Sequence, residues 1–540
     1  METKYLSIQS SLTATIIVGL FFIGLGYLNS KKTIDNRNYI IGNRDENTFS
    51  LTTSLAASAL GAWILFGPAS AATWGGFGAV IGYALGASTP MLLLYNFGPK
   101  IRKEFPKGLS LTEFIKKRFG IGILKISLFL ILFYLVIFLI AEVTAIAFLL
   151  NFISKTPLWI TAGITLIICL LYILRGGFKL SIITDKYQFL IIAVLIFASV
   201  ILILGNLEIN SFKLIKENSP NLINSKYLPN YTAGLTFFIA VAATNLFHQG
   251  NWQRIFAAKN NFILKKSLIY SSIIIFLIVF WMGYTGLISL SLNSKVIPDL
   301  AFFDLIISKN YLITISILIL ALALTLSTID TLINAISSIL IVNGSQINKA
   351  ISGKSVKNKT NYIIILISIL VFAFASKGFS ILYLFLLADL FCCAAVIIIF
   401  YGFFNKKISS KLSYFSILSA LISGILFFPS MDFQSSILVG NLLPIEFFST
   451  IITTNLLFIS FSIPLQKKSN DKVFVIVSFS FHAKTPDAEQ WNLPRPLSII
   501  ACSFPRMGIS TSFVFGLTTI AATPRVFESI DDLRGVISPL

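Results

Sequence analysis

Charged residues are scarce in this chain. Lys, Arg, Asp and Glu make up 12% of its 540 residues, while hydrophobic residues make up 56%. An ordinary globular chain has about 25% charged residues. A soluble protein of this composition could not cover its surface with polar side chains. Long apolar runs recur along most of the chain, so the sequence predicts an all-α protein that crosses a membrane many times.

Cysteine and acidic residues are also few. The four cysteines fit no disulfide framework, and two of them are adjacent inside an apolar run. The chain has 22 acidic and 42 basic residues, for a net charge of +20. In a soluble protein this excess would indicate nucleic-acid binding. Here the basic residues lie between apolar runs, as membrane topology requires, so we expect no nucleic-acid partner.

Thirteen apolar stretches are long enough, at roughly 17–30 residues, to cross a hydrocarbon core of ~30 Å. We expect spans near residues 8–28, 49–73, 76–98, 121–153, 157–174, 178–205, 232–250, 263–290, 310–343, 360–376, 378–405, 410–429 and 442–464. The first begins after Lys4 and runs too long for a signal-peptide core. We therefore expect it to remain as an uncleaved helix.

Lys and Arg concentrate in alternate loops. The loop at 99–120 carries seven basic residues, whereas the segment between the sixth and seventh spans carries only Lys213, Lys216 and Lys226. The bias predicts an external N-terminus and a cytoplasmic end of the last span, in the plasma (inner) membrane. After about residue 465 proline becomes frequent. We expect residues 466–540 to form a cytoplasmic tail of uncertain order, without a catalytic signature.

Two spans are interrupted by residues unusual in lipid. The second, Ser54–Pro68, combines small residues with Gly61 and Pro68. Such a segment can unwind and expose carbonyl oxygens, or it can pack closely against a neighbouring helix. The seventh ends in a polar and aromatic run over residues 243–254 that includes His248. We expect His248 to be a hydrogen-bonded structural residue rather than a ligand.

Polar side chains also recur inside other spans. In the ninth span they fall at steps of four, three and four, on one helix face: Ser327, Thr331, Asn334 and Ser338. Hydroxyls there can bind a hard cation such as Na⁺, or bond back to their own helix. Asp185 begins the sixth span, where it can attract cations or pair locally with Lys186 or Arg175. Glu142 and Asp389 are expected to serve helix packing or to lie near a ligand. Gly78, Gly82 and Gly86 form a small-residue ridge for close helix packing.

The two interrupted spans lie five spans apart. Residues 49–205 and 232–405 can therefore be arranged as two five-helix halves, the second inverted in the membrane. Residues 1–48 then add one extra helix and a loop, and residues 406–465 add two further helices. Matching broken helices in two halves point to a transporter with its site near the membrane midplane.

Several motifs fall in the order found in one transporter family. They are Gly42-Asn43-Arg44, Ser58-Ala59-Leu60-Gly61-Ala62-Trp63, Thr184-Asp185-Lys186-Tyr187-Gln188, Gln249-Gly250-Asn251-Trp252-Gln253-Arg254 with Ala257-Ala258-Lys259, and Ser327-Thr328-Ile329-Asp330. By these motifs the chain resembles the sodium:solute symporter family over about residues 8–465. That family carries solutes such as proline, sugars, pantothenate, monocarboxylates and urea.

The resemblance implies a five-plus-five inverted-repeat fold with a sodium site. The implied ligands are the carbonyls of Ala57, Leu60 and Leu324 and the hydroxyls of Ser327 and Thr328. Asp185 resembles the family's acid on the sodium exit path. Some amino-acid carriers of the family have a carboxylate in the broken second span. Here that position is Ala59, which disfavours a proline-type substrate.

We therefore expect Na⁺-coupled symport of a small polar organic solute by alternating access, with Na⁺ as the coupling ion and no other cofactor. The expected pocket wall is Ser54, Ser58, Thr244, Asn245 and Phe247. It offers no obvious fixed charge, which favours a neutral or zwitterionic solute such as urea or an amino acid. A passive channel or a solute sensor derived from a transporter remains an alternative. No HExxH, paired-acid or Ser/His pattern indicates an enzyme, no GxxxxGK[ST] motif indicates an ATP-driven pump, and no obligatory protein partner is indicated.

Overall fold

The computed structural model describes residues 5–29, 36–206, 211–224, 227–307, 310–347, 356–404, 409–426, 428 and 430, together with four short strands beyond residue 464. The chain divides into two compact parts, Met1–Cys393 and Ala394–Leu540, which are described separately.

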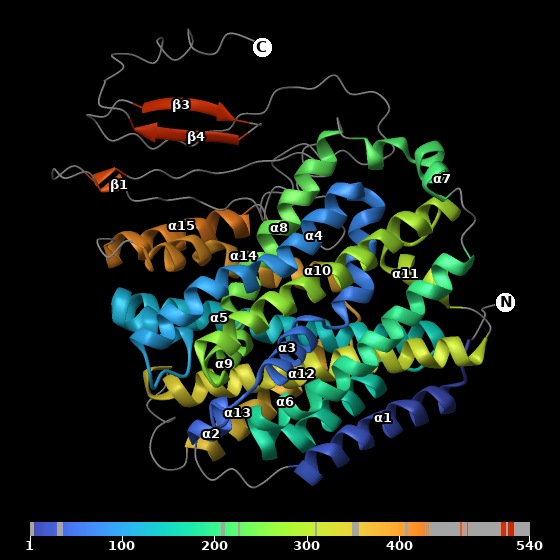
Figure 1. Ribbon diagram of the computed structural model, residues 1–540, viewed down its shortest axis with the longest axis horizontal. Helices are drawn as coiled ribbons and strands as arrows, with labels where there is room; N and C mark the ends of the chain where they lie inside the picture. The colour runs from blue at the N-terminus through green and yellow to red at the C-terminus, as the bar shows by residue number, and fades with distance from the viewer. Residues whose placement is uncertain are drawn as a thin grey trace. The chain divides into compact units, whose positions relative to one another are not determined.

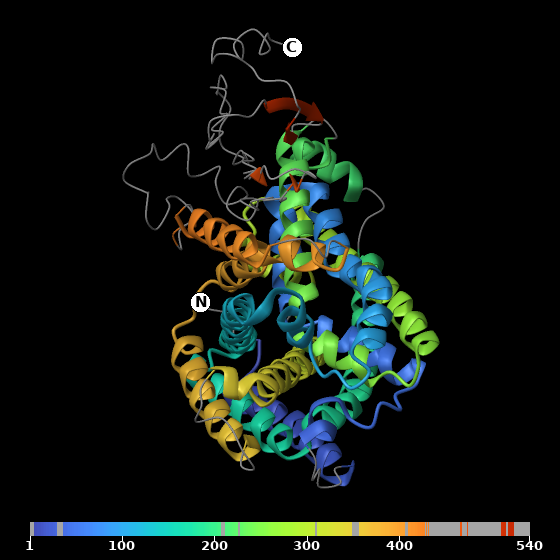
Figure 2. The same ribbon diagram turned by 90° about the vertical axis from the view of Figure 1, so that its left-hand side faces the viewer.

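The first part is helical (Figures 1 and 2). Its α-helices are α1 (Ile8–Asn29), α2 (Asn36–Ile41), α3 (Thr48–Ala59), α4 (Trp63–Glu104), α5 (Leu111–Ser154), α6 (Leu158–Asn206), α7 (Ser211–Asn218), α8 (Leu228–Phe247), α9 (Gln249–Ala257), α10 (Asn261–Leu292), α11 (Ala301–Ile306), α12 (Tyr311–Ile347), α13 (Val356–Ala375) and α14 (Ile381–Tyr401). The 3₁₀ turns η1 (Pro220–Ile223) and η2 (Pro298–Leu300) precede α8 and α11. Helix α14 continues across the boundary into the second part.

Three long helices are divided by a glycine in a backbone conformation that other residues rarely adopt. The φ angles are 59° at Gly76 in α4, 83° at Gly120 in α5 and 58° at Gly177 in α6. Gly76 is the first residue of the expected third span, and Gly177 falls between the fifth and sixth, at 174/178. Each of α4 and α6 therefore holds segments of more than one expected span.

By length and composition, eight described helices are long and apolar enough to cross a membrane, and three shorter apolar helices accompany them. These apolar helices overlap the segments expected as spans between residues 8 and 429. The thirteenth, at 442–464, lies outside the described residues. The total of thirteen spans and the inverted repeat remain predictions.

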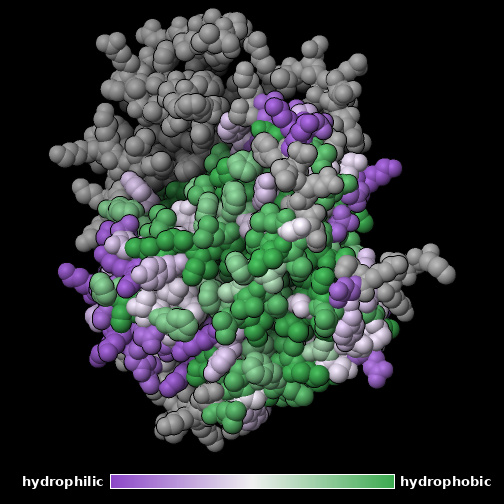
Figure 3. All heavy atoms as spheres, turned by 45° about the vertical axis from the view of Figure 1, so that its right-hand side comes forward, coloured by the Kyte–Doolittle hydropathy of each residue, from purple (hydrophilic) through white to green (hydrophobic). Residues whose placement is uncertain are grey.

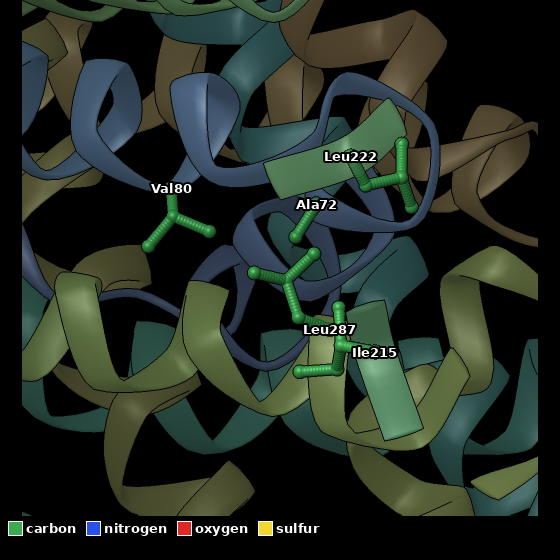
Figure 4. Close-up of a cluster of buried hydrophobic side chains, with 5 residues drawn as sticks. All are labelled: Ala72, Val80, Ile215, Leu222 and Leu287. Atoms are coloured by element: carbon green, nitrogen blue, oxygen red, sulfur yellow. The ribbon is translucent and has the colours of Figure 1, made fainter. Parts of the chain in front are cut away.

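Helix α4 packs along α8 and α10, and α12 packs against α5 and α6. The predicted glycine ridge of α4 faces α8, because a side chain at Gly86 would lie 2.7 Å from the carbonyl oxygen of Phe237. Figure 4 shows an apolar cluster that joins α4 and α10 to α7 and η1. Its members are Ala72, Val80, Ile215, Leu222 and Leu287. These contacts hold the helices that carry the first break.

Many large apolar side chains of the first part face outward. Ile17 on α1, Phe197 on α6 and Leu277 on α10 are 61%, 66% and 60% exposed. On the face drawn in Figure 3, hydrophobic residues cover a broad continuous area. Apolar surface of this extent is unfavourable in water and suits contact with lipid.

The second part contains α15 (Ser410–Leu426) and two antiparallel strand pairs. Strand β1 (Leu465–Gln466) pairs with β2 (Lys472–Val473), and β3 (Ile509–Val514) pairs with β4 (Leu517–Ala522). The cytoplasmic placement of the tail remains a prediction.

Candidate functional site

The first broken helix lies between α3 and α4. The N–H of Leu60 still donates to Ala56 O at 3.0 Å, but Leu60 itself has φ −97° and ψ 84°, outside the helical region. Helical bonding resumes when the N–H of Ile64 donates to Gly61 O at 3.2 Å. The break falls inside the segment where the sequence predicts unwinding.

The second break lies at His248, between α8 and α9. Its backbone is extended, and its side chain caps α9 because Nδ1 accepts a hydrogen bond from the N–H of Gly250 at 3.1 Å. A nitrogen that accepts carries no proton, so the ring is neutral in this geometry. His248 is therefore a structural, hydrogen-bonded residue in this structure, in the role expected for it.

Residues from both breaks surround a small cavity of about 30 Å³. Its lining consists of Ser58, Ala59, Trp63, Tyr83, Phe138, Val241, Thr244, Asn245, His248, Thr328, Phe385 and Asp389. That volume holds about one water molecule. An organic solute can therefore enter only when the surrounding side chains move.

The expected pocket wall is found in part along this cavity. Ser58, Thr244 and Asn245 line it. Ser54 instead accepts a hydrogen bond from Arg254, and Phe247 is buried without lining the cavity. The four aromatic side chains of the lining were not expected in the pocket wall: Trp63 lies in the broken second span, and Tyr83, Phe138 and Phe385 come from other spans. Asp389, expected to serve helix packing or to lie near a ligand, lines the cavity. An isolated Asp in the apolar run of the eleventh span was the available signal.

Asp389 adds an acidic side chain to a pocket wall that was expected to offer no obvious fixed charge. Its side chain is 5% exposed, and one carboxylate oxygen accepts a hydrogen bond from the hydroxyl of Thr244. Aromatic rings face the same cavity in two pairs. Trp63 and Tyr83 are stacked at 5.5 Å between centroids, and Phe138 and Phe385 meet edge-on at 4.7 Å. Asp389 is the one carboxylate in the lining, and no Lys or Arg accompanies it.

Asp185 forms the centre of a buried polar cluster. It pairs with Arg254 of α9 at 2.8 Å, and these side chains are 0% and 1% exposed. Ser54 and Ser327 both donate to the Asp185 carboxylate, the latter at 2.8 Å. Among the described side chains, the partner of Asp185 comes from a distant segment and not from the neighbouring Lys186. The alternative pairing with Arg175 lies outside the described side chains.

The same cluster satisfies the guanidinium of Arg254. It donates to Ser54 Oγ at 2.7 Å, to Gly250 O at 3.0 Å and to Thr331 Oγ1 at 3.0 Å. Each of these three oxygens accepts a hydrogen bond from the guanidinium, as a buried charge requires.

The proposed sodium ligands of α12 have different surroundings. Ser327 donates to Asp185, whereas the hydroxyl of Thr328 donates to Leu324 O at 3.1 Å. A side chain at Gly61 would lie 2.8 Å from Thr328 Oγ1, so the break and α12 are in direct contact at this point. Leu324, Thr328 and the break thus lie together, while Ala57 occupies the last turn of α3.

The polar face of α12 serves several partners. Thr331 accepts from Arg254, and Ser338 bonds back to Ala335 O at 2.9 Å. Asn334 Nδ2 is buried without a hydrogen-bond partner in the described structure. Asp330 accepts from Tyr172 at 3.1 Å and from Ser181 at 2.7 Å. Some polar side chains on this face of α12 therefore bond to other helices, and others bond to a carbonyl of α12 itself.

Three or more His, Cys, Asp or Glu side chains grouped to hold a metal are not found in the described part of the chain. A sodium site built from carbonyl and hydroxyl oxygens does not require such a group. The oxygens near the first break are of the type that hard cations bind.

Comparison with known proteins agrees with this geometry. Residues 39–419 match the sodium:solute symporter family. The chain belongs to this family. As a sodium:solute symporter it is an integral membrane transport protein, and Na⁺ is the coupling ion that the family implies.

The symporter resembles a curated fungal relative. It is 25% identical to the spermidine transporter DUR31 of Candida albicans over 388 residues, which cover 71% of this chain and 72% of the relative. A solved Na⁺-coupled sialic acid symporter, in a substrate-bound outward-open state, aligns with TM-score 0.62 and 17% identity. The alignment covers 77% of this chain and 91% of that one.

Mhp1, a nucleobase-cation-symport-1 family transporter solved in a closed conformation with bromovinylhydantoin bound, aligns with TM-score 0.52 and 15% identity. The alignment covers 79% of this chain and 93% of Mhp1. These two likenesses show that the symporter shares the fold of solved transporters.

Proposed function

We propose that this symporter couples Na⁺ entry to the uptake of a small organic cation that carries a protonated amine. Na⁺ binds where α12 meets the first break, at Thr328, Ser327 and the carbonyls of Ala57, Leu60 and Leu324. The solute binds in the adjacent cavity. A Na⁺ ion bound to both the first break and α12 stabilises the conformation in which these two elements are in contact. In that conformation the adjacent cavity is available to the solute.

The charge of the cavity carries the proposal for the solute. Asp389 supplies one negative charge, the imidazole of His248 is neutral in this geometry, and no Lys or Arg lines the cavity. A buried carboxylate binds an ammonium group through a charge-assisted hydrogen bond. The faces of Trp63 and Tyr83 attract the same charge, at about 0.5–2 kcal/mol per contact.

The relative's name supports the same solute class, because spermidine is a polyamine and DUR31 is called its transporter. A zwitterionic amino acid also carries an ammonium group, so it remains compatible with Asp389. Urea carries no charge and gains nothing from this carboxylate. The proposal therefore narrows the expected neutral or zwitterionic solute to one with a positive amine.

The test is uptake into vesicles that contain the purified full-length protein. Labelled spermidine, a zwitterionic amino acid and urea are compared with and without an inward Na⁺ gradient. We expect the wild type to concentrate the amine only when the gradient is present. Uptake that is equal with and without Na⁺ would indicate a passive channel, and binding without uptake would indicate a sensor.

Asp389→Asn keeps the shape and the acceptor for Thr244 but removes the charge. We expect uptake of the amine, as kcat/KM, to fall about 30-fold or more, the equivalent of ~2 kcal/mol for one lost buried charge contact. Asp45→Asn, at an exposed position, is the matched control and should have no effect. Unchanged amine uptake in Asp389→Asn would refute the assignment of the solute.

A further inference from the structure

Glu142 of α5 is a buried carboxylate that is only half satisfied. Its side chain is fully buried, and Oε2 accepts a hydrogen bond from the N–H of Ala62 at 2.8 Å. Its other oxygen, Oε1, is buried and has no hydrogen-bond partner among the described residues. A buried charged group without a compensating partner costs several kcal/mol. A cation beside Oε1, or a proton on the carboxyl group, would remove this cost.

The hydroxyl oxygen of Thr328 on α12 lies close to Glu142 Oε1, on the other side of Gly61. A side chain at Gly61 would collide with Glu142 Oε1 and lie 2.8 Å from Thr328 Oγ1, so these two oxygens are at most about 5 Å apart. The Thr328 hydroxyl donates its hydrogen to Leu324 O, which leaves lone pairs on Oγ1 free to bind a cation. Ca²⁺, a hard cation, takes oxygen ligands at about 2.3–2.6 Å, and we expect similar distances for Na⁺. One ion can therefore contact both oxygens.

The buried carboxylate that accepts from Ser327 of α12 already has a cation beside it. Asp185 has the guanidinium of Arg254 at 2.8 Å. Across the described part of the chain, no Lys or Arg forms an ion pair with Glu142. When Glu142 is ionised, no fixed cation among the described residues neutralises it, so its carboxylate is available to a mobile cation.

We propose that Glu142 Oε1 and Thr328 Oγ1 together bind one Na⁺ at the break between α3 and α4. The inference rests on the proposed function and adds a charged ligand to the carbonyl and hydroxyl oxygens already considered. Because Glu142 also accepts from the first N–H after the break, the ion links α5, α12 and the start of α4. Sodium binding is then coupled directly to the geometry of the broken helix.

The experiment measures binding of radioactive sodium to the purified full-length protein in detergent, with no solute present. The rise of the unfolding temperature with Na⁺ concentration is a second readout. Glu142→Gln keeps an oxygen that can accept from Ala62 and removes the charge. We expect its Kd for Na⁺ to rise at least about tenfold. Glu104→Gln, an exposed residue paired with Lys117, is the control and should bind as the wild type does.

A folded Glu142→Gln protein with the Na⁺ affinity of the wild type would overturn the inference, because Glu142 would then only cap α4. If the wild type itself binds no Na⁺, the proposed function fails as well. If the wild type binds Na⁺ and Glu142→Gln binds it equally well, only the role of Glu142 fails. If Glu142→Gln does not fold, Thr328→Val tests the same ion from the other side. It must also weaken Na⁺ binding, and an unchanged affinity refutes the shared site.

Discussion

Two neighbouring hydroxyl groups on α12, those of Ser327 and Thr328, lie in two different regions of the molecule. Ser327 joins the Asp185–Arg254 cluster, in which both charges are buried and bonded to several partners. Thr328 faces the first break and the cavity, where Glu142 Oε1 has no partner in the described structure. Complete bonding makes the cluster a fixed structural element, because any rearrangement would expose an unpaired charge. Because bonding is incomplete at the break, we propose that this region binds the ligands.

The largest expected effect is on stability, from removing Arg254. Arg254→Ala leaves Asp185 buried with no cation, which costs about 3–5 kcal/mol in measured cases. We expect a large fall in the unfolding temperature of the purified protein and in its abundance in the membrane. Asp185→Asn combined with Arg254→Gln removes both charges and should recover much of the loss.

The exposed pair of Lys117 and Glu104, at 3.0 Å, is the matched control for this loss. Glu104→Ala should change stability by only about 0–1 kcal/mol, as exposed pairs do. If Arg254→Ala were as mild as Glu104→Ala, the cluster would not be the fixed element described here.

A smaller effect should separate the two hydroxyls of α12. Thr328→Ala removes an oxygen at the break, and we expect the Na⁺ concentration for half-maximal uptake to rise about tenfold, or ~1.4 kcal/mol. Thr328→Ser keeps the oxygen and should be milder. Ser327→Ala removes a donor to Asp185, so we expect a smaller shift in Na⁺ dependence together with a loss of stability of about 1 kcal/mol.

Uptake measured against Na⁺ at matched membrane abundance distinguishes these variants. Equal shifts for Ser327→Ala and Thr328→Ala would show that both oxygens contact the ion equally. That result would remove the distinction between the two regions at α12.

The sequence predicts the elements better than it predicts their contacts. Apolar length locates the described spans, because crossing a bilayer imposes a minimum run of apolar residues. Small and polar residues at Gly61 and His248 predict both breaks, because such residues weaken a helix locally. The family motifs predict that Thr328 lies near the break.

Contacts between distant segments were harder to predict. Arg254 pairs with Asp185 across 69 positions of sequence, and nothing local favours it over Lys186. Asp389 and Glu142 were noticed only as acids inside apolar spans. Their roles depend on which helix faces which, and helical periodicity in an almost wholly apolar run does not fix that orientation.

The smallest expected effect concerns Asp330, which accepts hydrogen bonds from several hydroxyls. Tyr172→Phe removes the donor at 3.1 Å but leaves Ser181 at 2.7 Å and Thr184 at 3.2 Å. We expect a loss of about 0.5–1 kcal/mol in the free energy of unfolding, the low end of the usual range for one hydrogen bond because two donors remain, and no change in Na⁺ affinity. Tyr187→Phe, on an exposed tyrosine of the same helix, should change neither quantity. Thermal unfolding and sodium binding of the two purified variants provide the measurement. A changed Na⁺ affinity in Tyr172→Phe would place Asp330 within the ion-binding region and move the boundary between the two regions along α12.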